Sequence, residues 1–126
     1  MSAVAIVSFG FLHGAPPEAH LTVDLRQHFR DPHVSPELRY MTAHDEPVRA
    51  AVLGTPGIVA LIDATAAAVD AFAAGPSGGS VTIADGCAGG RHRAPTFALA
   101  LADRLTAAGH TVTVQHRDLA KDVVQR

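Results

Sequence analysis

Short apolar runs alternate with longer amphipathic stretches along this chain. Four short runs rich in Val, Ile and Thr predict buried strands, namely AVAIVSFGF, LTVDLR, SVTIADG and TVTVQHR. Two longer stretches, Pro47 to about Ala74 and Ala94 to Gly109, have the apolar spacing of helices. Strands that alternate with helices predict an α/β fold, a mainly parallel sheet of about four strands flanked by helices. Such a sheet is expected to be covered on both faces.

Glycine and proline set the expected limits of the helices. Thr55–Gly57 breaks the first helical stretch into two helices, while Pro95 suits the first turn of the last helix and Gly109 its C-terminal cap. Arg30–Pro47 carries three prolines and no clean period, which predicts a long ordered loop of functional importance. The expected buried stripes of the last two helices are Ile58, Leu61, Ile62, Thr65, Val69 and Phe72, and Phe97, Leu101, Leu105 and Ala108.

Composition changes this picture only modestly. The chain has 126 residues, which predicts one domain, 1–126. Its formal net charge of −2 argues against broad binding of polyanions, which needs clustered Lys and Arg, but allows one local basic pocket. The single cysteine excludes an internal disulfide and fits a reducing compartment. Without a leader pattern or an apolar run of about 18 residues, we expect a cytoplasmic protein with no membrane contact.

The segment GCAGGRHR, between the third strand and the last helix, carries the candidate chemistry. A helix N-terminus attracts anions through its unpaired N–H groups. Gly89 and Gly90 allow the backbone to approach a ligand, while Arg91, His92 and Arg93 offer side-chain donors. The segment therefore predicts an anion cradle. The alternative is a glycine-rich turn whose arginines are only solvated.

Cys87 allows a second interpretation, because Cys87 and Arg93 have the C-x5-R spacing of cysteine-dependent phosphatases. In such an enzyme Cys87 attacks phosphorus, and Asp24, Asp31 or Asp45 supplies the general acid. Those enzymes usually place Ser or Thr after the arginine, where this chain has Ala94. The alternative is a small apolar residue that closes the strand. We favour a binding role over an enzymatic one, and predict neither a metal nor a cofactor.

The order of several motifs resembles the C-terminal domain of the RapZ (YvcJ) family. The matching segments are SFGF, VDLR, PHVSPELR, GCAGGRHR and VQHRDL. The resemblance implies a fold like a sugar-phosphate-binding subdomain of phosphofructokinase. It also implies a regulatory module that senses glucosamine-6-phosphate, oligomerises partly through this domain and, in enterobacterial members, binds a small RNA. A phosphorylated small molecule, a second copy of the chain and a protein partner are the expected partners.

The resemblance also implies a ligand site. The expected ligand-binding residues are Asp24, His33, Cys87, Ala88, Gly89, Gly90, Arg91, His92 and Arg93. Arg26, Arg39 and Thr42 match motif residues of less defined role. Two alternatives stay open: His33 can anchor its loop, and Asp24 can pair with Arg26 or Arg39. His116 and Arg117 can line the pocket or pair with Asp118.

Four departures from the family pattern qualify this prediction. The family's nucleotide-binding domain does not precede the motifs, so we expect a stand-alone module. Leu12 and His13 replace a Lys-Tyr pair. Asp85 stands where an apolar residue is common, and we expect it to add negative charge near the cradle. The tail has only Lys121 and Arg126 as bases, which weakens the case for RNA binding.

Overall fold

Four parallel strands form one sheet in the computed structural model, which describes residues 2–126. Met1, part of the predicted domain 1–126, lies outside the described residues. The strands β1 and β3 are central, β2 and β4 lie at the edges, and the order is β2-β3-β1-β4. Their bounds are Ala3–Gly10 for β1, Leu21–Asp24 for β2, Val81–Cys87 for β3 and Thr111–His116 for β4. The parallel four-stranded α/β prediction is confirmed.

Three helices complete the fold, α1 (Glu46–Leu53), α2 (Ile58–Ala73) and α3 (Arg93–Ala107). The predicted break between α1 and α2 is confirmed, and Gly57 reverses the chain there with φ of +93°. Gly109 follows α3 with φ of +96°, as expected for the residue after a helix end. Two short 3-10 helices lie in the loops, η1 (Phe11–His13) and η2 (Pro32–Val34).

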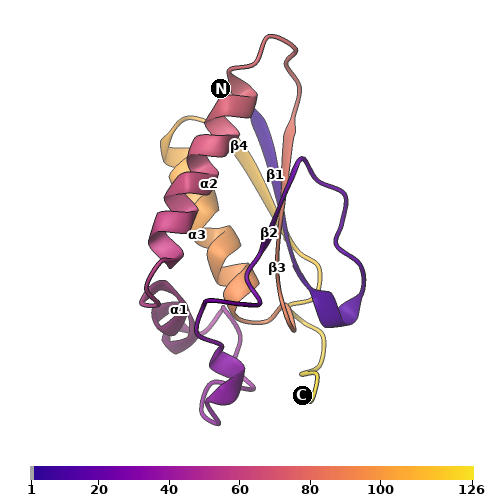
Figure 1. Cartoon of the computed structure of the whole chain (residues 1–126), viewed down its shortest axis with the longest axis vertical. Coiled ribbons are helices and arrows are strands. Elements are labelled where there is room, and N and C mark those ends of the chain that lie inside the picture. The colour runs from indigo at the N-terminus through magenta and orange to yellow at the C-terminus, as the bar shows by residue number, and fades with distance from the viewer. Residues whose placement is uncertain (1) are drawn as a thin grey trace.

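All three helices lie on the same side of the sheet (Figure 1). The expectation of helices on both faces is therefore wrong. Residues 11–20, which join β1 to β2, cross the other side with only the short helix η1. On that side β4 presents Thr111, Thr113 and Gln115, which are exposed. Polar side chains need no cover, so one helical layer is sufficient.

The core lies between the sheet and its helical layer. Val4, Ile6 and Ile83 of the central strands pack in one cluster with Phe97 and Leu101 of α3. Burial of each such side chain contributes roughly 1.5–3 kcal/mol. The predicted stripes are confirmed except at their ends. Phe72 is 48% exposed and Ala108 is also exposed, because both lie at helix termini, where the core no longer covers them.

No single helix within residues 2–126 is long and apolar enough to cross a membrane, and the bent pair α1 and α2 passes that test on length and composition alone.

Asp85 is the one acidic side chain that β3 buries in this core. It alternates with Ile83 and Cys87 on the face under the helices and is fully buried. Neither carboxyl oxygen has a hydrogen-bond partner among residues 2–126. Burial raises the pKa of Asp85 well above its ordinary value. Asp85 therefore holds its proton, and the expectation that it adds negative charge near the cradle is wrong.

Replacing Asp85 should stabilise the domain. The raised pKa means that above about pH 4 the unfolded chain loses this proton and the folded chain keeps it, so stability falls as pH rises. We expect Asp85→Val to raise the free energy of unfolding at pH 7 by about 1–3 kcal/mol, the cost of an unpartnered buried polar group. Urea unfolding between pH 4 and 7 measures this. Asp85→Asn should flatten the pH dependence with a smaller gain, and a loss of stability in Asp85→Val would contradict the assignment.

Candidate functional site

The carboxyl ends of β1 and β3 meet the start of α3 at one end of the molecule (Figure 1). The backbone is tightly packed there. A Cβ atom at Gly10 would lie 2.4 Å from the carbonyl carbon of Gly89. Gly90 has φ of +76°, and a Cβ there would lie 2.9 Å from Cβ of Asp118. Glycine is therefore required at Gly10 and Gly90 for these segments to meet.

The loop of residues 88–92 presents free amide groups in front of α3. Within residues 2–126, the N–H groups of Gly89, Gly90 and Arg91 donate to no protein acceptor. A Cβ at Gly89 would meet no atom within 4 Å, so this position borders open space. The positive end of the α3 dipole adds to these donors. The loop can therefore accept an anion through its backbone.

The Arg93 guanidinium, by contrast, bonds to acceptors within the protein. Arg93 is buried, and its Nη1 donates to the carbonyl oxygens of Leu25 at 3.0 Å and Arg26 at 3.1 Å. Its Nη2 lies 3.3 Å from Oδ2 of Asp31. These contacts join the first residue of α3 to the end of β2 and to the long loop. The Nε of Arg93, also buried, has no partner among residues 2–126. In this structure Nη1 and Nη2 of Arg93 bond the protein, so Arg93 shapes the site.

Asp31 is the acidic centre of this network. Its carboxylate also pairs with Arg126 at 2.6 Å and accepts from the backbone N–H of His33 at 3.1 Å. Burial opposes ionisation, but the hydrogen bond from Arg126 and the charge of Arg93 lower the pKa of Asp31. Asp31 is thus ionised and holds Arg93 and Arg126. A general acid must carry a proton, so this role does not suit Asp31.

Arg91 and His92 hold the long loop and the tail against the start of α3. Arg91 donates to the carbonyl oxygens of Tyr40 at 3.0 Å and Lys121 at 2.7 Å. His92 Nε2 donates to the Met41 carbonyl oxygen at 2.8 Å, which fixes its proton on that nitrogen. Burial lowers the pKa of His92, so the ring is neutral. These bonds place the predicted long loop against the start of α3.

Asp118 fastens the tail to the end of β1. Its buried Oδ2 accepts from the backbone N–H of Gly10 at 2.8 Å and from Arg117 Nε at 3.0 Å. Lys121 Nζ lies 2.7 Å from Oδ1. Burial opposes ionisation, but the hydrogen bonds from Arg117 and Gly10 lower the pKa of Asp118 to about 2. Of the two roles open for Arg117, the structure shows pairing with Asp118.

Cys87 closes β3 beneath the loop. Its side chain is 2% exposed, and Sγ accepts from the backbone N–H of Ala94 at 3.4 Å. This arrangement agrees with the interpretation of Cys87 as a small residue in the floor of the site. The neighbouring Ala88 carbonyl oxygen accepts from the N–H of Leu12 at 3.0 Å and ties η1 to the loop.

Asp24 lies outside this cluster, at the exposed end of β2. It makes a bidentate pair with Arg26, with Nη2 to Oδ2 at 2.7 Å. The hydrogen bond from Arg26 lowers the pKa of Asp24. The Arg26 guanidinium lies 3.7 Å from the centre of the Phe11 ring, which fixes the pair beside η1. Of the alternatives for Asp24, the structure shows the pair with Arg26.

The two remaining histidine predictions have different outcomes. His33 is buried in η2 and its carbonyl oxygen accepts from Arg39 Nε at 2.8 Å, so it anchors the long loop. His116 ends β4, and its Nδ1 lies 2.7 Å from Oγ of the buried Ser8. Burial and the nearby charge of His44 lower the pKa of His116. Burial also lowers the pKa of His33, so both rings favour the neutral form at pH 7.

The structure thus brings residues 87–93 together with two residues that the sequence did not single out as site builders, Gly10 and Asp118. It also adds Asp31, which the sequence named only as a candidate general acid. Gly10 lies in the motif SFGF and Asp118 in the motif HRDL. The sequence therefore contained both motifs, but nothing local indicated a contact between residues 108 positions apart. Thr42 and Arg39 serve the long loop, where Thr42 N–H donates to Asp45 Oδ2 at 2.9 Å.

A family model described as the RapZ C-terminal domain matches residues 2–120. The chain belongs to this family. Among similar curated proteins, all named nucleotide-binding proteins, one from Streptomyces coelicolor is 40% identical over 120 residues. Others come from Thermobifida fusca, 38% identical over 120 residues, and Bifidobacterium adolescentis, 42% identical over 123 residues.

These alignments cover 93%, 93% and 94% of this chain. They cover 40%, 40% and 39% of the respective relatives. The chain thus spans about two fifths of the length of the RapZ-family relatives it matches.

Arg93→Ala should destabilise the domain by about 3 kcal/mol, because two backbone carbonyls lose their donor and Asp31 loses a buried cation. Chemical denaturation followed by circular dichroism measures this. The matched control is Arg26→Ala, which removes an exposed pair and should leave the midpoint close to that of the wild type. Equal midpoints for the two variants would contradict the role given to Arg93.

Asp118 should make the domain acid-sensitive. Because its pKa is lowered from 3.8 to about 2, its contribution is complete above about pH 4 and is lost as pH falls through about 2. Asp118→Asn should therefore be less stable than the wild type at pH 7, and the difference should shrink between pH 4 and pH 2. Urea unfolding at stepped pH values tests this, and a constant difference would speak against it.

Proposed function

We propose that this RapZ C-terminal domain is a regulatory module that binds a phosphorylated small molecule at the loop of residues 88–92. The observation that carries the proposal is the set of free amide groups of Gly89, Gly90 and Arg91 in front of α3, with open space at Gly89. Phosphate oxygens are strong acceptors, and backbone N–H groups at a helix start suit them. The natural cellular setting we propose is the cytoplasm.

The cationic side chains support the proposed site indirectly. Arg91 and Arg93 hold the loop by bonds to carbonyl oxygens, so their charges are fixed near the amides without facing them. The charge of Arg93 is offset by the ionised Asp31, so Arg93 acts through the shape of the loop, whereas the half-buried Arg91 also adds positive charge near the amides.

An amino sugar phosphate is the ligand class we favour, with glucosamine-6-phosphate as the specific candidate. Its support is the membership of the RapZ family together with the backbone donors of the loop. Asp24, at the end of β2, offers a carboxylate for a hydroxyl or an ammonium group, and its pair with Arg26 is exposed and exchangeable.

The phosphatase alternative has weaker geometric support. In that mechanism Arg93 must face the phosphoryl oxygens together with the Cys87 thiolate. Here Arg93 donates to the carbonyl oxygens of Leu25 and Arg26, and Cys87 is buried against Ala94. Asp24 and Asp31 are each paired with arginine. We therefore expect no turnover of an aryl phosphate, and turnover abolished in Cys87→Ser would reverse this choice.

Titration calorimetry with glucosamine-6-phosphate tests the proposed site. We expect saturable binding that inorganic phosphate competes for weakly. Gly89→Val should reduce affinity by at least about tenfold, because its side chain enters the open space in front of the amides. Gly78→Val is the matched control, since a Cβ there also meets no atom within 4 Å, but it lies in the turn before β3.

Two results would contradict the proposal. One is the absence of heat with glucosamine-6-phosphate, glucosamine and inorganic phosphate alike. The other is equal affinity in Gly89→Val and Gly78→Val, which would place the ligand elsewhere. Binding of glucosamine without phosphate would retain a sugar site but remove the anion cradle.

A further inference from the structure

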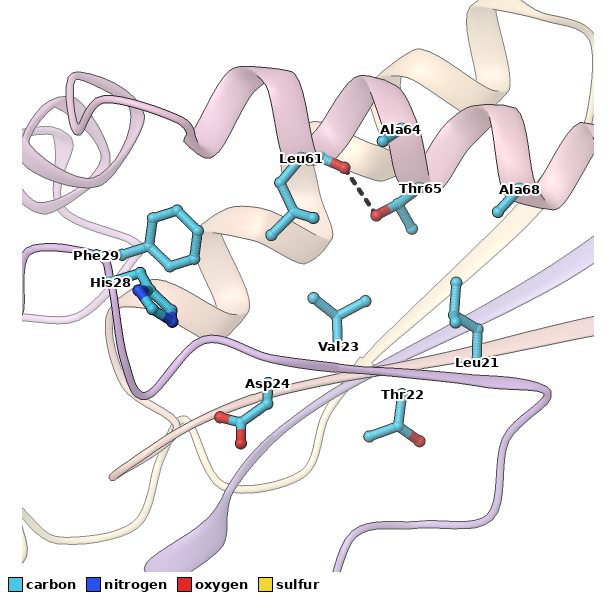
Figure 2. Close-up of a pocket in the computed structure, with 10 residues that line it drawn as sticks. All are labelled: Leu21, Thr22, Val23, Asp24, His28, Phe29, Leu61, Ala64, Thr65 and Ala68. Carbon is cyan, nitrogen blue, oxygen red and sulfur yellow. Dashed lines mark hydrogen bonds between the residues drawn. The ribbon is translucent and has the colours of Figure 1, made fainter.

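An apolar groove of about 480 Å³ runs between the edge strand β2 and helix α2. Figure 2 shows Leu21 and Val23 of β2 pointing toward α2, while Asp24 points away from the groove. The helical wall consists of small or apolar residues, namely Leu61, Ala64, Thr65 and Ala68. The Thr65 hydroxyl donates to the Leu61 carbonyl oxygen at 2.8 Å, so its polar group is already satisfied within the helix.

Helix α2 continues this apolar wall along its length. One stripe of the helix holds Leu61, Thr65, Ala68 and Phe72. Phe72 is 48% exposed, and its ring centre lies 5.9 Å from that of His20. The two acidic residues of α2 pair elsewhere, Asp63 with Arg104 and Asp70 with His110. Because β2 is the outermost strand here, no further strand within residues 2–126 covers this uncharged stripe.

The outer backbone groups of β2 are free beside the groove, since β2 pairs only with β3. Leu25 N–H donates to the Gly86 carbonyl oxygen at 2.7 Å, and alternate residues of a parallel strand bond the same neighbour. Leu21 and Val23 therefore bond β3, and Thr22 directs its N–H and C=O groups outward. A free edge of this kind is a template for another strand.

Charges of opposite sign flank the groove. Just past the end of β2, Arg26 and Arg30 are exposed, and Asp24 pairs with Arg26. Within residues 2–126, Arg30 forms no ion pair, and neither does the exposed Glu18 just before β2. The groove thus has an uncharged middle, a positive end near Arg30 and a negative end near Glu18.

We propose that this groove binds an extended apolar segment of another protein, which adds to the sheet as a strand beside β2. Backbone bonds to Thr22 hold the segment, and its alternate apolar side chains pack against α2. The segment runs antiparallel to β2, the more stable arrangement per residue. Acidic residues therefore precede its apolar part and meet Arg30, while basic residues follow it and meet Glu18.

The groove sets the size of the segment and the class of contact. Ala64 and Ala68 are small, so the wall leaves room for branched side chains such as leucine and isoleucine. The strand β2 has four residues, so a segment of about six residues spans it. An interface this short falls below roughly 1,200 Å² of total buried surface, the range of transient contacts.

Fluorescence anisotropy with a labelled peptide tests this surface on the full chain. The probe has aspartates at its start, alternating isoleucine and threonine over about six residues, and lysines at its end. We expect saturable binding with a Kd below about 1 mM, and a loss of at least about tenfold in Ala68→Glu, which places an unpaired charge in the apolar groove. Ala67→Glu, one residue away on the exposed side of α2, is the matched control and should bind like the wild type.

Backbone methylation of the probe separates strand addition from a simple apolar contact. Methyl groups on the amides that face β2 remove the donors to Thr22, and should weaken binding by at least about tenfold. Methyl groups on the alternate amides, which face solvent, should leave affinity close to that of the parent peptide. Hydrogen exchange should slow at the Thr22 N–H when the parent peptide binds, and stay unchanged at Thr113 on the far edge strand β4.

Four results would overturn the proposal. The first is the absence of saturable binding up to about 1 mM peptide. The second is equal affinity in Ala68→Glu and Ala67→Glu, which would place the peptide on another surface. Equal affinity of the two methylated peptides would exclude pairing with β2, even if the groove accepts apolar side chains. Sedimentation that shows a second copy of the chain excluding the peptide would assign the groove to that copy.

Discussion

The candidate site depends on the buried guanidinium of Arg93. Its donors reach the carbonyl oxygens of Leu25 and Arg26, and its charge faces Asp31. One side chain thus fixes the start of α3, the end of β2 and the start of the long loop. A buried cation is costly unless its surroundings supply acceptors, so these segments must adopt this one arrangement for the charge to be tolerated. This arrangement also determines the conformation of the loop in front of α3.

This constraint explains why a cation-rich loop offers mainly backbone donors. Arg91, His92 and Arg93 each point into the protein and bond main-chain carbonyls. Turn hydrogen bonds satisfy some carbonyl groups of the long loop, and side chains satisfy others, such as those of Tyr40 and Met41. What remains for an anion is the row of amides at Gly89 and Gly90. Neutral donors of this kind are preorganised and need no counter-charge when the site is empty.

Periodicity was sufficient to predict the strands and the helix breaks. Within each element, apolar residues such as Ile6, Ile83 and Leu101 recur at the spacing of a strand or a helix. Periodicity could not predict that the helices share one face of the sheet. The geometry of the connections between strands, and not composition, decides on which face a helix packs. Periodicity also failed at Asp85, where burial suppresses the expected charge. The direction of the Arg93 side chain depends on the carbonyl groups of Leu25 and Arg26. They lie more than 60 residues earlier in the chain, so no local pattern encodes this contact.

The carboxyl end of the sheet and the free edge of β2 are physically connected. Arg93 binds carbonyl groups just beyond Asp24, the last residue of β2. The position of that strand end therefore depends on the start of α3, where the proposed anion binds. If ligand binding moves the first turn of α3, the end of β2 must move with it or lose two buried hydrogen bonds. Linkage is reciprocal, so any contact that shifts the end of β2 would then alter the affinity of the proposed loop for its ligand by the same factor. One buried cation thus joins the loop in front of α3 to the edge of the sheet.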